Sequence, residues 1–125
     1  MKNLNKALFL NLNNNVALAT KGILLDKQKK YEEAKKYYLK SIESDPNVAQ
    51  TYSNYASNRL QVGDYNGAVQ YGEKAVKLAN NIKDKGVLCL SYHKIGMIKK
   101  RDSLYTELEK LRYRNLDDLK EIFNK

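Results

Sequence analysis

The sequence is poor in the residues that build most metal and catalytic sites. It contains one cysteine, one histidine and no tryptophan in 125 residues. A lone cysteine cannot form an intrachain disulfide, and one cysteine with one histidine is too little for most zinc arrangements. Cys89 lies in the apolar stretch VLCLSY and is expected to be buried, whereas His93 is expected at the surface or in a groove.

Glycine and proline are also scarce, at six and one residues, which favours helices over strands and turns. No stretch approaches the roughly 18 apolar residues of a membrane span. An N-terminal signal peptide is not favoured, because the apolar run of residues 7–10 is short and Asn11 and residues 13–15 are polar. We therefore expect an all-α protein in the cytoplasm, with a secreted or periplasmic location as the less favoured alternative.

The sequence gives little indication of a catalytic site. The paired acids Glu32–Glu33 and Asp117–Asp118 fall at expected helix starts, where the helix dipole accounts for them. No glycine-rich phosphate loop follows a predicted strand. We expect a protein that is not an enzyme and that uses no metal and no cofactor.

Positive charge dominates the composition. Lysine and arginine number 23 against 14 acids, a net charge of +9 and a pI of about 9.5. Such a surface favours acidic proteins, nucleic acid or anionic lipid as partners. The length fits a single domain.

The clearest feature of the chain is an internal repeat. Residues 31–46 (YEEAKKYYLKSIESDP) resemble residues 65–80 (YNGAVQYGEKAVKLAN), 34 positions further on. A second shift of the sequence against itself, by 40 positions, superposes five pairs: Tyr52 on Tyr92, Tyr55 on Ile95, Ala56 on Gly96, Tyr65 on Tyr105 and Ala68 on Leu108. Three copies with a period in this range predict stacked helical units that cannot bury their apolar faces alone.

Each copy divides into two predicted helices. Asp45 and Pro46 suit an N-cap and a first helical position, so a helix is expected to begin there. Gly63 and Asp64 predict a turn, followed by a helix from Tyr65 to about Leu78. Small residues at Gly22, Ala56 and Gly96, and at Ala34 and Ala68, are expected to let helix backbones approach closely.

This pattern resembles the tetratricopeptide repeat (TPR). The first copy matches with Leu18, Gly22, Leu25, Ala34, Tyr38 and Pro46, and the second with Tyr52, Tyr55, Ala56 and Ala68. The third matches with Tyr92, Ile95 and Gly96, and its six extra residues resemble the variety with longer helices. The resemblance implies a right-handed α-solenoid of three hairpins with a C-terminal capping helix. The expected units are residues 1–14 (N-terminal helix or cap), 15–48, 49–82 and 83–113 (repeats, the third longer and divergent) and 114–125 (cap).

The first helix of each hairpin should line the inner face of such a stack. The predicted peptide-binding groove comprises Gln50, Ser53, Asn54, Ser57, Gln61, Leu90, His93, Lys94, Met97 and Arg101, continued in the first copy by Val16, Ala19, Thr20, Ile23 and Lys27. These side chains suit an extended peptide or a helix. Some TPR proteins clamp a C-terminal carboxylate. Asn54 and Lys94 fall at matching places, but Ala19, Ile23 and Leu90 depart from that pattern, so the clamp is not expected.

A second candidate surface is a basic rim formed by the turns within the repeats. Its predicted residues are Lys27, Lys29, Lys30, Lys99, Lys100 and Arg101. We expect a non-enzymatic adaptor that binds a protein or peptide, with an acidic partner favoured by charge. Two alternatives remain: nucleic acid or another polyanion on the rim, less favoured because no ladder of aromatic and basic residues is visible, and a structural subunit that stacks through Leu4, Phe9 or Phe123. The sequence does not determine the oligomeric state.

Overall fold

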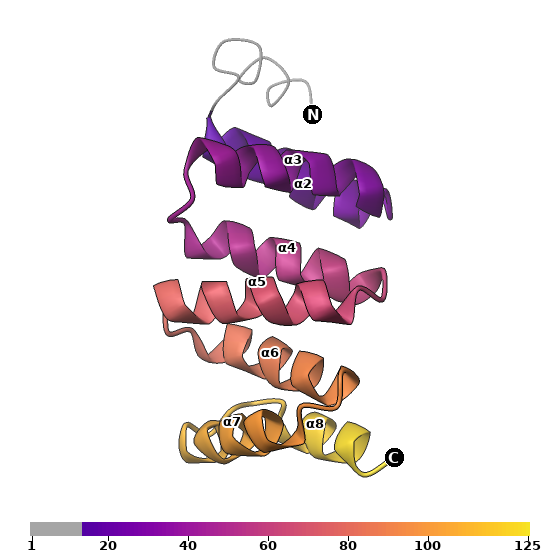
Figure 1. The fold of residues 1–125 in the computed structure, drawn as a ribbon, viewed down its shortest axis with the longest axis vertical. Helices are drawn as coiled ribbons and strands as arrows, with labels where there is room; N and C mark the ends of the chain where they lie inside the picture. Colours follow the sequence, from indigo (N-terminus) through magenta and orange to yellow (C-terminus); the bar gives the residue numbers. More distant parts are fainter. Residues whose placement is uncertain (1–13) are drawn as a thin grey trace.

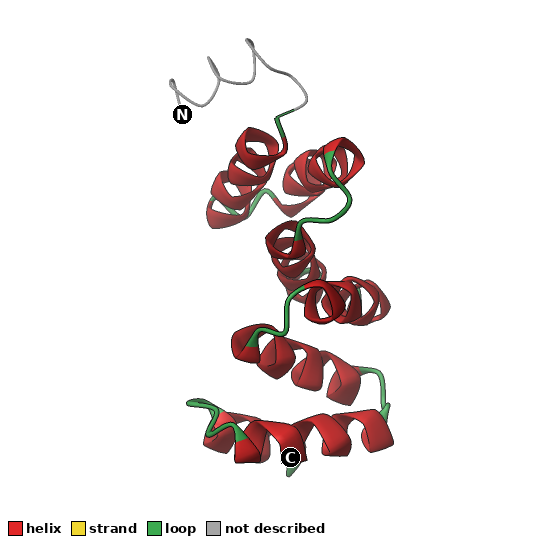
Figure 2. Cartoon of the chain, turned by 90° about the vertical axis from the view of Figure 1, so that its left-hand side faces the viewer, coloured by secondary structure: helices red, strands yellow, loops and turns green. Residues whose placement is uncertain are grey.

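The computed structural model describes residues 14–125, which form seven α-helices and no strand. The helices are α2 (Asn15–Lys27), α3 (Tyr31–Ser44), α4 (Ala49–Gln61), α5 (Tyr65–Leu78), α6 (Ile82–Lys94), α7 (Ile98–Lys110) and α8 (Leu116–Phe123). They stack in chain order along the long axis (Figure 1), and Figure 2 shows the same stack from the side. This is the predicted right-handed α-solenoid.

The helices pack as three hairpins, α2–α3, α4–α5 and α6–α7. The first helices of the hairpins also contact one another, α2 with α4 and α4 with α6, and α6 then contacts α8. We call the side of the stack formed by α2, α4 and α6 the A-helix face. Of the predicted N-terminal unit, residues 1–13 lie outside the described part, and the Asn14 side chain accepts a hydrogen bond from the backbone N–H of Ala17, which caps α2.

Three apolar clusters hold the stack together. The first contains Leu25, Ala34, Tyr38 and Tyr55, the second Val69, Leu88 and Tyr92, and the third Cys89, Leu108 and Leu119. Each cluster takes residues from one hairpin and from the helix that follows or precedes it. Burial between neighbouring units therefore adds to the packing within each hairpin and supplies the cohesion that a repeat protein needs.

Small residues allow neighbouring helices to pack closely in the first two repeats. A Cβ atom on Gly22 would lie 2.7 Å from Cε1 of Tyr38, so only glycine fits beneath that ring. Ala56, Ala34 and Ala68 are all buried. These positions behave as the sequence predicts.

The prediction for Gly96 is wrong. Gly96 has a φ of +76° and a Cβ on it would meet no atom within 4 Å. It lies in the turn between α6 and α7, as Gly63, with a φ of +82°, lies in the turn between α4 and α5. Both glycines supply the left-handed backbone conformation that ends a helix, so neither serves close helix packing.

The third hairpin is accordingly offset by 33 residues from the second, not by 40. Its helices have 13 residues each, so the extra turn expected in this repeat is absent. Cys89, rather than Gly96, takes the place of Gly22 and Ala56, and it is fully buried. Burial raises the pKa of the Cys89 thiol to about 12.

The start of the fourth helix also differs from the prediction. Asp45 ends α3, and α4 begins at Ala49 rather than at Pro46. The Asp45 carboxylate accepts the backbone N–H of Asn47 across 3.1 Å, which forms an Asx turn in place of an N-cap. The Pro46 carbonyl then accepts a hydrogen bond from the Tyr52 hydroxyl and ties this loop to α4.

The C-terminal helix closes the stack as predicted, with Leu119 buried against α6 and α7. The partly buried Phe123 ring packs against α6 and α7, with its centre 4.7 Å from that of the His93 ring and 5.9 Å from that of the Tyr105 ring. Leu4 and Phe9 lie outside the described residues. Among the helices described, none has the length and apolar character needed to cross a membrane.

Candidate functional site

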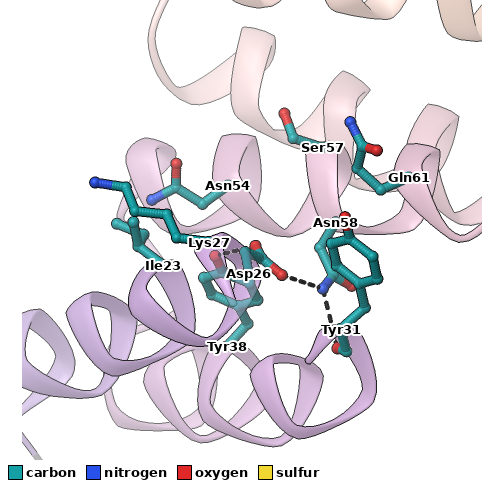
Figure 3. Close-up of a pocket in the computed structure, with 9 residues that line it drawn as sticks. All are labelled: Ile23, Asp26, Lys27, Tyr31, Tyr38, Asn54, Ser57, Asn58 and Gln61. Atoms are coloured by element: carbon teal, nitrogen blue, oxygen red, sulfur yellow. Dashed lines mark hydrogen bonds between the residues drawn. The ribbon is translucent and has the colours of Figure 1, made fainter. Parts of the chain in front are cut away.

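A pocket of about 310 Å³ opens on the A-helix face between α2 and α4. Figure 3 shows the side chains that line it. They are Ile23, Asp26, Lys27, Tyr31, Tyr38, Asn54, Ser57, Asn58 and Gln61. The turn after α2 brings Tyr31 and Tyr38 of α3 beneath the two first helices, so three helices contribute to one site.

The pocket contains a carboxylate held by two neutral donors. The Tyr38 hydroxyl donates to Oδ2 of Asp26 across 2.6 Å, and Nδ2 of Asn58 donates to Oδ1 across 2.8 Å (Figure 3). Burial, together with this hydrogen bond to a negative group, raises the pKa of Tyr38 far above its ordinary value. The Tyr38 hydroxyl is therefore a fixed donor throughout the physiological pH range.

Asn58 is in turn fixed on both sides of its amide. Its Nδ2 also donates to the carbonyl of Tyr31, and its Oδ1 accepts hydrogen bonds from Nε and Nη2 of Arg59. Arg59 is buried, lies over the Tyr55 ring and forms ion pairs with Glu32 and Asp64. This network satisfies the buried polar groups and makes one side of the pocket rigid.

Three other pocket residues of α4, by contrast, carry polar groups that no other described residue engages. The side chains of Ser57 and Gln61 form no hydrogen bond within residues 14–125, and Asn54 uses only its carbonyl oxygen, which accepts Nε2 of Gln50. Ile23 of α2 adds an apolar wall. An amide, a hydroxyl and an aliphatic side chain are thus available together to a ligand.

The predicted groove residues of α4 lie largely where the sequence suggests. Asn54, Ser57 and Gln61 line the pocket, together with Ile23 and Lys27 of α2. Ser53 is engaged, because its hydroxyl donates to Asp84 of α6 across 2.6 Å. Sequence reasoning missed Asp26, Tyr31, Tyr38 and Asn58 as pocket residues.

The predicted groove residues of the third repeat do not join this site. Leu90 packs against the Cys89 cluster and Met97 against the Leu88 cluster. Lys94 ends α6, and its ammonium lies 5.7 Å from the centre of the Tyr65 ring. The 33-residue offset places Val87, not Lys94, at the position equivalent to Asn54.

His93 and Arg101, also predicted in the groove, instead hold the terminal helix. Nη1 of Arg101 lies 2.8 Å from Nδ1 of His93, and its guanidinium lies over the Phe123 ring. Burial, and then the charges of Arg101 and Lys94, lower the pKa of His93. The partly exposed His93 therefore packs in the α6–α8 contact.

The predicted basic rim is divided between different environments. Lys29 and Lys30 are exposed in the turn between α2 and α3, and Lys27 borders the pocket. Lys99 and Lys100 belong to the first turn of α7 rather than to the turn before it, and Lys100 pairs with Glu73 across 3.4 Å. Arg101 is turned inward, with 15% of its side chain exposed.

Among residues 14–125 no group of three or more histidine, cysteine, aspartate or glutamate side chains could hold a metal ion. The architecture and the pocketed A-helix face define a helical-repeat solenoid of the kind built from paired helices. The family model of the tetratricopeptide repeat matches residues 17–48 and 49–82, more than half of the chain. The chain belongs to this family.

Solved structures agree on the fold. The chain is similar to YrrB, a TPR protein with an unusual peptide-binding site, with a TM-score of 0.86, 21% identity and coverage of 96% of this chain. It spans 62% of the YrrB chain. The first TPR of Spaghetti (RPAP3), bound to an HSP90 peptide, gives a TM-score of 0.76 at 22% identity and coverage of 90% and 94% of the two chains.

The Arabidopsis OM64 TPR domain is also similar, with a TM-score of 0.80, 18% identity and coverage of 91% of this chain and 97% of that one. No curated protein matches the sequence significantly. At these identities, the likeness to the solved structures concerns the fold.

Proposed function

We propose that this protein is a non-enzymatic scaffold that binds a peptide or a helix of another protein on its A-helix face. The observation that carries the proposal is the pocket between α2 and α4, where Ser57 and Gln61 have no partner among the described residues and Asn54 has a free amide N–H₂. Side-chain amides and hydroxyls on a rigid helical face can hydrogen-bond the backbone of an extended peptide without a change in the fold.

Two features support this proposal over a purely structural role for the pocket. The Asp26–Asn58–Arg59 network keeps one side of the pocket in place, so little ordering is needed on binding. Two proteins of the same fold also bind peptides: the Spaghetti domain is bound to an HSP90 peptide, and YrrB has a peptide-binding site.

The partner as a whole is proposed to be acidic. The chain carries a net charge of +9, which attracts acidic proteins over a distance of about one Debye length, roughly 8 Å at physiological ionic strength. This field acts on the rate of encounter more than on the final contacts. Raising the salt concentration should therefore slow association while leaving dissociation nearly unchanged.

A peptide selected from a random library on the immobilised protein provides the test. We expect the double variant Asn54→Ala, Ser57→Ala to bind that peptide with an affinity at least about tenfold lower, because two hydrogen bonds to the peptide are lost. Circular dichroism should show unchanged helix content. The matched control is Asn66→Ala with Ser103→Ala, exposed positions on α5 and α7. Equal affinity of the first double variant and the wild type would contradict the proposal.

A further inference from the structure

The carboxylate of Asp26 is a charged group without an opposite charge beside it. Its two hydrogen-bond donors, Tyr38 and Asn58, are both neutral. None of the ion pairs among residues 14–125 includes Asp26. A carboxylate offers about four acceptor positions, so two donors leave room for more.

Lys27, the basic residue that lines the pocket, does not neutralise Asp26. Figure 3 shows its ammonium extended away from Asp26, toward Asn54. Arg59 lies behind Asn58 and directs its guanidinium to the amide oxygen of that residue and to Glu32 and Asp64. On its pocket side, the Asp26 carboxylate is thus not paired with any cation of the described residues.

We call the packing of a hairpin against the first helix of the next hairpin a step, so that α2, α3 and α4 form the first step and α4, α5 and α6 the second. The second step has a lysine where the first has Gln61. Lys94 corresponds to Gln61 by the 33-residue offset, and Tyr65 corresponds to Tyr31 by the 34-residue offset. In the step between α4 and α6 the Lys94 ammonium lies 5.7 Å from the centre of the Tyr65 ring. At the position of Gln61, the second step therefore has a cation beside its tyrosine ring, whereas the first step has a neutral amide.

The two steps also differ in the residues around that position. Leu60, Gly72 and Ser91 stand in the second step where the first has Asp26, Tyr38 and Asn58. The carboxylate, with its donors, occurs in the step that lacks the internal lysine. A guanidinium or ammonium from outside would complete the arrangement, with its methylene stem along Ile23 and the Tyr31 ring.

From this complementarity we infer that the pocket between α2 and α4 receives a basic side chain, arginine or lysine, of the bound peptide. The inference rests on the proposed function and names the anchor residue for that site. It is compatible with a partner that is acidic overall, because the long-range charge of +9 is screened within about 8 Å, whereas Asp26 acts at contact distance.

Three blocked heptapeptides test the inference, each with six alanines around a central arginine, citrulline or glutamate. Citrulline keeps the shape of arginine and removes its charge. Each peptide is titrated into the ¹⁵N-labelled full chain, and the backbone amide shifts of α2, α3 and α4 are followed. We expect the arginine peptide to shift the amides of Asp26, Tyr31 and Gln61 and to bind about tenfold tighter than the citrulline peptide, as a charge-assisted hydrogen bond warrants.

Two variants locate the effect. Gln61→Lys should place an internal cation over Tyr31, as Lys94 lies over Tyr65, and should abolish the preference for arginine over citrulline. Asp26→Asn removes the charge and should abolish it as well. The matched control is Gln70→Lys, the same substitution at an exposed position of α5, which should leave the preference unchanged.

The outcomes separate the two claims. Equal binding of the arginine and citrulline peptides in the pocket, or tighter binding of the glutamate peptide, would overturn the basic anchor and leave the peptide-binding function standing. The anchor would also be overturned if Gln61→Lys kept the preference of the wild type. If no peptide moved any amide of α2 or α4, and the library selection also found no ligand for this face, both claims would fail.

Discussion

The hydroxyl of Tyr38 donates a hydrogen bond to the Asp26 carboxylate across 2.6 Å and so joins α3 to α2 at the pocket. Tyr38 is also fully buried in the first apolar cluster, in close contact with Gly22. A single residue therefore links the packing of the first hairpin to the position of the pocket carboxylate. Changes at Tyr38 should be felt in both stability and binding.

Tyr38→Phe should lower the free energy of unfolding by about 1.5–3 kcal/mol, the usual contribution of a hydrogen bond to a charged group. The ring is kept, so packing should change little. Urea denaturation followed by circular dichroism measures the effect. Tyr37→Phe is the matched control, because the Tyr37 hydroxyl forms no hydrogen bond within the described residues. Equal stability of the two variants would contradict a structural role for the Tyr38–Asp26 bond.

Gly22→Ala should destabilise the protein by about 1–3 kcal/mol, although alanine favours helices over glycine by about 1 kcal/mol. The added Cβ would lie within 3.0 Å of three atoms of the buried Tyr38 ring, which has no room to move. Thermal unfolding provides the measurement, with the exposed Thr20→Ala on the same helix as control. A rise in melting temperature for Gly22→Ala would mean that the two helices are not in close contact there.

The first two repeats could be predicted well because their small and large residues recur at a constant spacing. Gly22 and Ala56, and Ala34 and Ala68, are each 34 residues apart and occupy equivalent buried positions. The third repeat was aligned wrongly because tyrosine is abundant in this chain. Tyr52 and Tyr92 matched by chance at a spacing of 40 residues. The true equivalent of Tyr52 is Lys85, a buried lysine that pairs with Glu107, and no apolar pattern reveals it.

The pocket was only partly predictable for a different reason. Asn54, Ser57 and Gln61 follow from helical spacing along α4 alone. Asp26 and Asn58 are 32 residues apart and meet only because α2 and α4 pack side by side. Neither residue belongs to the repeating pattern, so nothing in the sequence indicates that one would bond to the other.

Acidic pH should loosen the terminal helix through His93. Its native pKa lies below the ordinary value of 6.5, so the unfolded chain binds the proton more readily. The contribution of His93 to stability is therefore complete above about pH 6.5 and is lost as the pH falls through the lower native pKa. Protonation of Nδ1 would also remove the acceptor for Arg101 beside Phe123.

We expect the wild type to lose stability between pH 7.5 and 5.5, and His93→Gln to lose less over the same interval. Urea denaturation at both pH values gives the comparison. Three other charged groups surround His93: Lys94 on the same helix, and Arg101 and its ion-pair partner Asp102 on α7. Parallel pH dependence in the two proteins would show that His93 does not contribute.

Cys89 should be chemically inert in the folded protein. It is fully buried, and its pKa of about 12 leaves almost no thiolate at neutral pH. Iodoacetamide at pH 8 should therefore leave the native chain unmodified, as read by mass spectrometry, and should alkylate it in concentrated urea. Rapid alkylation of the native chain would mean that the α6–α7 contact opens readily.

The most direct test of peptide binding on the A-helix face is a map of the backbone amides that shift when the library-selected peptide binds. We predict that the largest shifts fall on α2 and α4 around Asn54, Ser57 and Gln61, next to Asp26. Shifts confined to α5 and α7, which contribute no residue to the pocket, would contradict the central claim that the pocketed A-helix face is the binding surface.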